Sequence, residues 1–168
     1  TGTAAANTIT GGGLADTITG GQGVDSLTGG AGADTFAFGA SDSIAGTSLV
    51  VVTDFTTASD IVSFVAATIL AAEADGVTAT SDVDTTAGGL ISFHADDDTY
   101  AEMVIAIQAD TQLDVAGSVA IWTVGGDTYV YNAGAAVGNA DDIIIKLTGV
   151  TGGDFDTITD LGTSITIG

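Results

Sequence analysis

Residues 2–37 form four consecutive frames of nine residues: GTAAANTIT (2–10), GGGLADTIT (11–19), GGQGVDSLT (20–28) and GGAGADTFA (29–37). A glycine opens each frame, at Gly2, Gly11, Gly20 and Gly29. The sixth position holds a carboxylate or its amide (Asn7, Asp16, Asp25, Asp34), and the eighth holds an apolar residue (Ile9, Ile18, Leu27, Phe36). A unit of nine residues is too short to bury a core alone. The fixed period therefore predicts that each frame stacks on the next.

The residue types in the frames favour a site for a hard cation. Glycine allows positive φ and lets carbonyl groups crowd inward where a Cβ would obstruct them. The runs between the loops are β-formers with one apolar residue each. Carbonyl and carboxylate oxygens suit Ca²⁺, which takes about six to eight flexible oxygen ligands. We therefore expect several Ca²⁺ ions to bind between the frames.

Two other interpretations of a glycine-rich stretch fit less well. A flexible linker would have no reason to keep four frames in register. A phosphate-binding loop needs a following lysine or a long helix, and the sequence has neither here.

The last two frames match G-G-x-G-x-D-x-U-x at every fixed position, so this segment resembles the RTX (repeats-in-toxin) family. The resemblance implies half-turns of a short right-handed parallel β-roll, with ions between loops two frames apart. Asn7 would then stack with Asp25, and Asp16 with Asp34. The ligands implied within the repeats are Asn7, Gly11, Gly13, Asp16, Gly20, Gln22, Asp25, Gly29, Ala31 and Asp34.

The first two frames depart from the family pattern. Asn7 is neutral, and Thr3, Ala5 and Leu14 replace expected glycines. We therefore expect the first site to be the weakest.

The stretch after the repeats resembles the aspartate-rich cap of RTX rolls, whose pattern is I-x-D-F…D-x-I. It is present as residues 52–55 (VTDF) followed by residues 60–62 (DIV), and the resemblance implies that Asp54 and Asp60 complete the last calcium sites. The alternative is that both are solvated turn residues. Val50 stands where the family often has another aspartate. We expect two stacked turns from the frames, closed by this cap.

Downstream, the pattern predicts a β-rich α+β module, so the chain as a whole should be mainly β. Thr99 and Glu102 have the spacing of a capping box, and Tyr100, Met103, Val104 and Ile107 form one apolar helical face that should end near Asp110. Gly125-Gly126 between two β-rich runs predicts a hairpin over 118–132. Further strands are expected at 49–55, 60–64, 90–94, 141–150 and 165–167, a short helix at 66–74, and loops at 39–48 and 75–89. We divide the chain into repeats (1–37), cap (38–64) and C-terminal module (65–168).

Composition points in the same direction as the repeats. The net charge is −21, from 22 acidic residues against Lys146 alone. Such a surface repels nucleic acid and anionic lipid, and multivalent cations would relieve its self-repulsion. A hydrophobic content of 45% is too high for an ordinary disordered tail. No apolar run approaches the ~20 residues of a membrane helix, so we expect no direct membrane insertion.

Catalytic chemistry has little support in the sequence. Cysteine is absent and His94 is the only histidine, which excludes thiol catalysis and an HExxH site and makes a structural role for His94 the simpler interpretation. Ser41 and Ser43 lack a G-x-S-x-G frame. We therefore expect no enzyme activity.

Several other residues leave alternatives open. Residues 96–98 (DDD) precede the expected helix, where they suit its dipole, or they form an accessory cation site. Asp141 and Asp142 look like a solvated turn. Lys146 should pair with a local carboxylate. Trp122, Tyr129 and Tyr131 belong to the sheet core or its rim, or to an interaction surface.

The expected role is extracellular. The chain begins at Thr1, inside a repeat and without an N-terminal signal, which suggests a C-terminal piece of a longer protein. The RTX resemblance implies export by type I secretion machinery with an uncleaved signal near the C-terminus. Residues 124–132 and 141–155 also resemble C-terminal modules of S-layer-like surface proteins. We expect a calcium-dependent module for secretion and for self-association or cell-surface assembly. One alternative is the tail of an RTX enzyme or toxin (protease, lipase, cytolysin). Another is the tail of an adhesin, in which Trp122 and the tyrosines contact a ligand.

Overall fold

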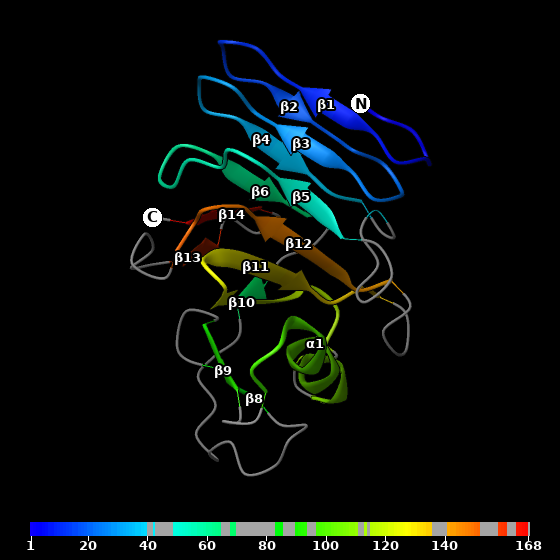
Figure 1. Cartoon of the computed structure of the whole chain (residues 1–168), viewed down its shortest axis with the longest axis vertical. Helices are drawn as coiled ribbons and strands as arrows, with labels where there is room; N and C mark the ends of the chain where they lie inside the picture. The colour runs from blue at the N-terminus through cyan, green and yellow to red at the C-terminus, as the bar shows by residue number, and fades with distance from the viewer. Residues whose placement is uncertain are drawn as a thin grey trace.

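The computed structural model describes residues 1–39, 42, 49–64, 68–69, 83–85, 90–93, 97–110, 113, 115–135, 141–151, 158–160 and 164–167. Within these ranges the chain is mainly β with one α-helix, as predicted (Figure 1). The strands form a seven-stranded sheet, a five-stranded sheet and a two-stranded sheet.

Six short strands at the N-terminal end alternate between the two larger sheets, and we call them the solenoid. One sheet receives β1 (Thr8–Thr10), β3 (Ser26–Thr28) and β5 (Val50–Val52); the other receives β2 (Thr17–Ile18), β4 (Thr35–Ala37) and β6 (Ile61–Ser63). Neighbours within each sheet are parallel, so that Ile9 pairs with Leu27 and Ile18 with Phe36. This path is consistent with the expected β-roll. The frames make two turns, and the cap strands β5 and β6 add a third turn that we did not predict.

The eighth residue of each frame faces the interior between the two sheets. Leu27 and Phe36 are fully buried, as are Val52 and Val62 at the equivalent places in the cap. Ile9 is only partly buried, because no strand lies beyond β1.

The C-terminal module continues both sheets of the solenoid. The hairpin of β10 (Ser118–Val124) and β11 (Asp127–Asn132) turns at Gly125 and Gly126, both with positive φ, which confirms the predicted turn. The next strand, β12 (Ile143–Leu147), pairs antiparallel with β11 and parallel with β5. In the other sheet, β14 (Ser164–Ile167) pairs antiparallel with β6 and with β13 (Ile158–Asp160).

The shared sheets enclose one hydrophobic core across the repeats, the cap and the module. Leu27 and Phe36 of the repeats belong to the same buried cluster as Val62 of the cap and Ile145 and Ile165 of the module. The solenoid therefore packs against the module through a continuous apolar interior.

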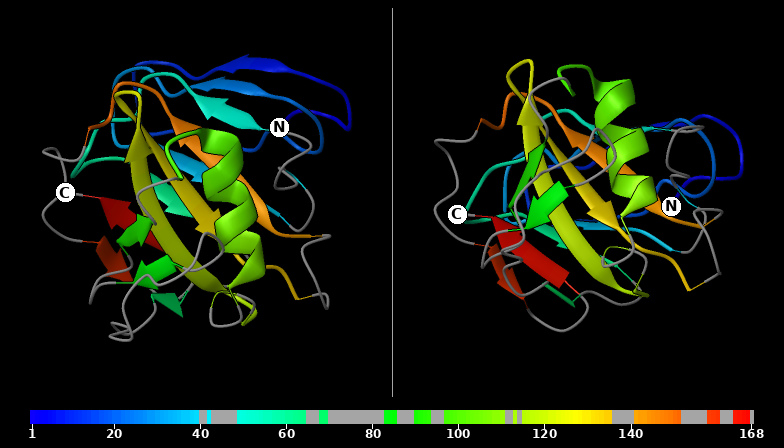
Figure 2. Two further views of the ribbon diagram at one scale, coloured as in Figure 1. Left: turned by 60° about the horizontal axis from the view of Figure 1, so that its bottom comes forward. Right: turned by 90° about the horizontal axis from the view of Figure 1, so that it is seen from below.

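The helix α1 (Tyr100–Ala109) covers the outer face of the β10–β11–β12 region (Figure 2). Thr99 caps it, and the predicted box with Glu102 is present in both directions. Met103, Val104 and Ile107 pack in a second buried cluster with ring residues of the sheet. Among the described residues, no helix is long and apolar enough to cross a membrane.

Two predicted irregular or helical stretches contain strands. Thr68–Ile69 is β7, paired parallel with β10, so the helix expected at 66–74 is wrong there. Val83–Thr85 is β8, paired with β9 (Ile91–Phe93), within a stretch expected to be loop. β-branched residues in both short runs favour strands, and β7 finds its partner β10 far along the chain, which local propensity does not register. The rest of both stretches, together with His94, Ser41 and Ser43, lies outside the described residues.

Packing around the second cluster contradicts two expectations from the sequence, one about Asp142 and one about three aromatic residues. Asp142 is buried rather than solvated; it accepts hydrogen bonds from Tyr131 Oη (2.8 Å) and from Gly134 N–H (2.9 Å). Trp122, Tyr129 and Tyr131 are all buried, and Trp122 stacks on Tyr129 with 5.4 Å between ring centroids. The three rings therefore belong to the core, and the ligand-contacting surface considered for them is wrong.

Candidate metal centre

The loops of the solenoid form two columns, one at each end of its strands (Figure 1). The first column contains loops 11–16, 29–34 and 53–60; the second contains loops 2–7 and 20–25. Because the strands pair in parallel register, loops of one column lie next to one another along the stack. Each column therefore brings together side chains from frames that are two apart.

A ladder of three carboxylates runs through the first column. The backbone N–H of Asp16 donates to Asp34 Oδ1 at 2.9 Å, and the N–H of Asp34 donates to Asp60 Oδ1 at 2.9 Å. The second oxygen of Asp60 accepts from Thr56 N–H at 2.8 Å. Asp16 and Asp34 thus stack as the resemblance implies, and Asp60 of the cap continues the same ladder.

The second column has a weaker set of ligands. The N–H of Asn7 donates to Asp25 Oδ1 at 2.8 Å, so these two residues also stack. The register that pairs Ser26 with Val51 places Val50 next to Asp25, and Val50 is fully buried. This column therefore offers one amide, one carboxylate and an apolar residue where the first column offers three carboxylates.

Two carboxylate oxygens in these columns are buried without a partner. Asp25 and Asp34 are each 1% exposed, and Oδ2 of each has no hydrogen-bond donor. An ionised carboxylate in such a place is costly unless a cation or a proton compensates it. The unsatisfied oxygens fit a bound cation at both positions.

The glycine that opens a frame leaves room for the carboxylate that ends the same loop. A Cβ at Gly20 would meet the Asp25 carboxylate, and a Cβ at Gly29 would meet that of Asp34. A Cβ at Gly11 would meet the Gly29 carbonyl oxygen of the neighbouring loop. Any side chain at these glycines would fill the space in which carbonyl and carboxylate oxygens converge.

The third and fourth frames differ from the first two in backbone conformation. Gly21, Gly23, Gly30 and Gly32 have φ between 87° and 129°. The equivalent residues Thr3, Ala5, Gly12 and Leu14 do not have positive φ. The substitutions noted in the first frames thus occur where the backbone does not require glycine, and the well-formed loops are 20–25 and 29–34.

The remaining expected ligands lie at the edges of the columns. Both oxygens of Asp54 accept backbone N–H groups of the neighbouring loop, from Gly29 (2.7 Å) and Gly30 (2.8 Å). Gly13, Gln22 and Ala31 are exposed at the loop apices, where only their backbone carbonyls repeat from frame to frame. Among the described residues no three Asp, Glu, His or Cys side chains gather around one point. An ion held between these loops would therefore bind to backbone carbonyls as well as to Asp16, Asp25, Asp34 and Asp60.

Sequence reasoning missed the second glycine of the frames as a donor. Gly12 N–H donates to Asp16 Oδ2 at 2.6 Å within its own loop, and Gly30 N–H donates to Asp54 across the column. The doubled glycine that opens frames two, three and four was the available signal.

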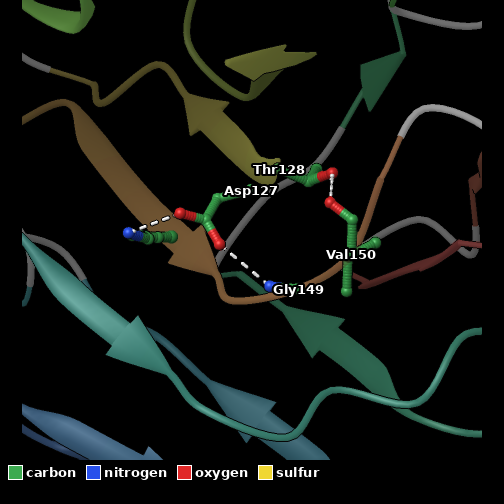
Figure 3. Close-up of polar contacts among 5 residues, drawn as sticks. Asp127, Thr128, Gly149 and Val150 are labelled. Atoms are coloured by element: carbon green, nitrogen blue, oxygen red, sulfur yellow. Dashed lines mark hydrogen bonds and ion pairs between the residues drawn. The ribbon is translucent and has the colours of Figure 1, made fainter. Parts of the chain in front are cut away.

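Outside the columns, the single lysine has the local partner that we expected. Lys146 Nζ lies 2.6 Å from Asp127 Oδ2, and Asp127 Oδ1 accepts from Gly149 N–H at 2.9 Å (Figure 3). The hydrogen bond between Lys146 and Asp127 raises the pKa of the Lys146 ammonium and lowers the pKa of the Asp127 carboxyl group. The adjacent Thr128 Oγ1 donates to Val150 O at 2.7 Å. These contacts fix the end of the hairpin against the turn after β12.

Comparison with known proteins bears on the repeat loops of these columns. Residues 1–36 match the family model of the RTX calcium-binding nonapeptide repeat, in four copies. A search among curated proteins found no match to the chain. The family match covers the segment that carries the two unpaired carboxylates, and it supports the assignment of residues 1–36 as RTX repeats that bind Ca²⁺.

Proposed function

We propose that this chain is the calcium-dependent folding, secretion and assembly module of an extracellular structural protein of the S-layer-like kind. The observation that carries the proposal is the pair of buried, unpaired Oδ2 atoms of Asp25 and Asp34. Without a cation they oppose folding of the solenoid, and with Ca²⁺ bound they hold its loops together.

Calcium would act as the signal that the chain has left the cell. Extracellular modules of this class bind Ca²⁺ with dissociation constants of about 10⁻⁴–10⁻³ M, far above intracellular free calcium. Each site saturated tenfold over its dissociation constant adds about 1.4 kcal/mol to stability, so a few sites decide whether the chain folds. The unfolded chain passes through type I secretion machinery, and folding outside prevents its return.

The S-layer-like role rests on composition. The chain contains no cysteine and no proline and carries one lysine as its only basic residue other than His94. Trp122, Tyr129 and Tyr131 are buried, which favours this role over the adhesin alternative, in which these rings would contact a ligand. In this proposal the module has no catalytic role of its own. The alternative parent, an RTX enzyme or toxin, would carry an HExxH or G-x-S-x-G domain upstream.

The calcium proposal is tested by circular dichroism and calorimetry on the 168-residue chain, first in EDTA and then titrated with CaCl₂. We expect the β signal and the melting temperature to rise with calcium and to saturate in the millimolar range. A spectrum and melting temperature that ignore calcium would contradict the proposal. Electron microscopy and light scattering with and without calcium test assembly.

A further inference from the structure

Asp97, in the C-terminal module, has a buried carboxylate oxygen without a hydrogen-bond donor. The residue is 6% exposed, and its Oδ2 has no partner. Among the described residues, two other buried carboxylate oxygens share this state, Oδ2 of Asp25 and Oδ2 of Asp34. Both of those lie in the segment that matches the calcium-binding repeats, whereas Asp97 lies outside it.

Burial alone does not leave a carboxylate unpaired in this chain. Asp60, Asp110 and Asp142 are also buried, and each accepts at least one N–H or O–H group. The unpaired oxygens of Asp25 and Asp34 occur where a cation is expected to bind. Asp97 has the same property at a place where no repeat can account for it.

The N-terminus of α1 does not explain the unpaired oxygen. The carboxylate of Glu102 accepts from Thr99 Oγ1 at 2.6 Å and from Thr99 N–H at 3.1 Å, and Glu102 N–H donates to Thr99 Oγ1 at 3.3 Å. This box caps the first turn of the helix without Asp97, which lies two residues before the N-cap.

The chain has few basic side chains with which to compensate the charge of Asp97. It contains no arginine, and its single lysine, Lys146, lies 2.6 Å from Asp127. An ionised carboxylate that is buried without a partner is costly. The remaining basic side chain is His94, three residues before Asp97 in the sequence, and it is included in the test below.

Asp97 lies close to a group of aromatic rings in the module. Phe93, at the end of β9, meets Trp122 edge-on with 5.9 Å between ring centroids. Tyr100, the first residue of α1, lies 4.9 Å from Tyr129. Asp97 is three residues from Tyr100, a separation that spans at most about 11 Å. These rings provide a spectroscopic probe for a metal ion at Asp97.

We propose that Asp97 is a ligand of a further Ca²⁺ ion, bound in the C-terminal module just before α1. Oδ2 supplies one charged oxygen, and backbone carbonyls and water complete the set, since Ca²⁺ accepts about six to eight oxygen ligands in flexible geometry. The repeat loops set the precedent, because among the described residues they too bring no three acidic side chains to one point. Calcium then stabilises the module directly, in addition to the solenoid.

Terbium luminescence tests the proposal on the 168-residue chain folded in CaCl₂. Tb³⁺ replaces Ca²⁺ at oxygen sites, and it emits strongly on excitation of tryptophan or tyrosine only when it is bound near such a ring. Residues 1–64 contain neither, so ions in the repeats lack a nearby sensitiser in their own loops. We expect sensitised emission as Tb³⁺ is added, and its loss when excess Ca²⁺ is restored.

A matched pair of variants locates the ion. Asp97→Asn keeps the shape of the side chain and removes its charge, so the Tb³⁺ concentration for half-maximal emission should rise at least about tenfold. Asp98→Asn makes the same change at the neighbouring exposed residue and should leave that concentration unchanged. Circular dichroism in CaCl₂ checks that both variants are folded. The wild-type titration remains a test even where a variant does not fold.

Pairing of Asp97 with His94 is the competing explanation. It predicts that the melting temperature of the wild-type chain falls toward that of Asp97→Asn as pH rises through about 6.5, with no change in terbium emission. The metal site predicts instead that His94→Gln leaves the emission intact.

The outcomes separate this inference from the proposed function. Absence of sensitised emission from a chain that calcium folds overturns the Asp97 site alone. Emission that persists unchanged in Asp97→Asn, or that falls equally in Asp98→Asn, also overturns it. Calcium-sensitive emission that depends on Asp97, in a chain whose fold does not respond to calcium, would support the site and contradict the proposed function.

Discussion

Asp34 connects three loops of the first column through its own atoms. Its Oδ1 accepts from Asp16, its N–H donates to Asp60, and its Oδ2 is left buried and unpaired. Asp25 has the same unpaired oxygen, but its neighbours in the second column are an amide and a buried valine. At the scale of single residues, the two columns are therefore not equivalent as calcium sites.

This difference predicts an order of calcium affinities. Asp34→Ala should weaken binding most, Asp25→Ala less, and Asn7→Ala least. Loss of one partner of a buried polar group costs about 1–3 kcal/mol, so we expect roughly a tenfold or greater loss of affinity for Asp34→Ala. Isothermal titration calorimetry measures it. Equal effects of the three substitutions would contradict the ranking.

Gly30 and Gly13 provide a matched pair for the backbone requirement. Gly30 has a φ of 97°, and a Cβ there would meet the Gly12 carbonyl; Gly13 has no positive φ and no neighbour within 4 Å of an added Cβ. Gly30→Ala should therefore cost about 1–3 kcal/mol of unfolding free energy. Gly13→Ala should be nearly neutral. Calcium-saturated thermal melts compare them, and similar losses for both would show that conformation is not the cause.

At the scale of elements, the pair of Asp127 and Lys146 links two neighbouring strands of the module. Its side chains are 20% and 26% exposed, so a double-mutant cycle with Asp127→Asn and Lys146→Met should give a coupling of about 0.2–1 kcal/mol.

The pH dependence of this coupling follows from the two pKa shifts. The pKa of Asp127 is lowered in the folded state, so its contribution to stability is fully present above its unfolded pKa of about 3.9 and is lost as the pH falls through the lower folded pKa. The pKa of Lys146 is raised in the folded state, so its contribution to stability is fully present below its unfolded pKa of about 10.4 and is lost as the pH rises through the higher folded pKa. Coupling measured by thermal unfolding should thus be constant between about pH 5 and 9 and fall outside that window; a coupling that changes within it would contradict the assignment.

Sequence predicts elements well where the signal is local. The capping box of Thr99 and Glu102 and the Gly125-Gly126 turn each lie within a few residues, and both elements form where expected. Pairing between distant segments leaves no such local signal. The parallel pairing of β12 with β5 joins residues 145 and 50, and Asp142 is buried because strand pairing brings it to Tyr131.

In the candidate site, too, the local pattern was predictable from the sequence and the contacts between distant groups were not. The frame period was enough to predict which residues stack, because the register follows from counting. It could not show that Asp60 continues the ladder of Asp16 and Asp34, since loop 53–60 differs in length from the repeat loops. Nor could it show that Oδ2 of Asp25 and of Asp34 lacks a donor, which depends on the packed positions of all neighbouring groups.

At the scale of the whole molecule, a charge of −21 predicts two separable effects of ions. In EDTA, raising NaCl from low concentration to about 0.5 M should raise the melting temperature modestly by screening self-repulsion. CaCl₂ at matched ionic strength should raise it further, and MgCl₂ should not, because Mg²⁺ demands a stricter octahedral site. Scanning calorimetry compares the three salts. Equal stabilisation by Mg²⁺ and Ca²⁺ would indicate screening rather than site binding.

The stack of Trp122 on Tyr129 gives the chain a built-in optical reporter. Trp122 is the only tryptophan, and it lies in the module, on strand β10, rather than in the calcium-binding loops. Its emission therefore responds to a calcium ion in those loops through changes transmitted by the shared sheet and core, not by direct contact. Comparing that emission with the far-ultraviolet signal during a titration would show whether the two halves of the molecule order in one step or in two.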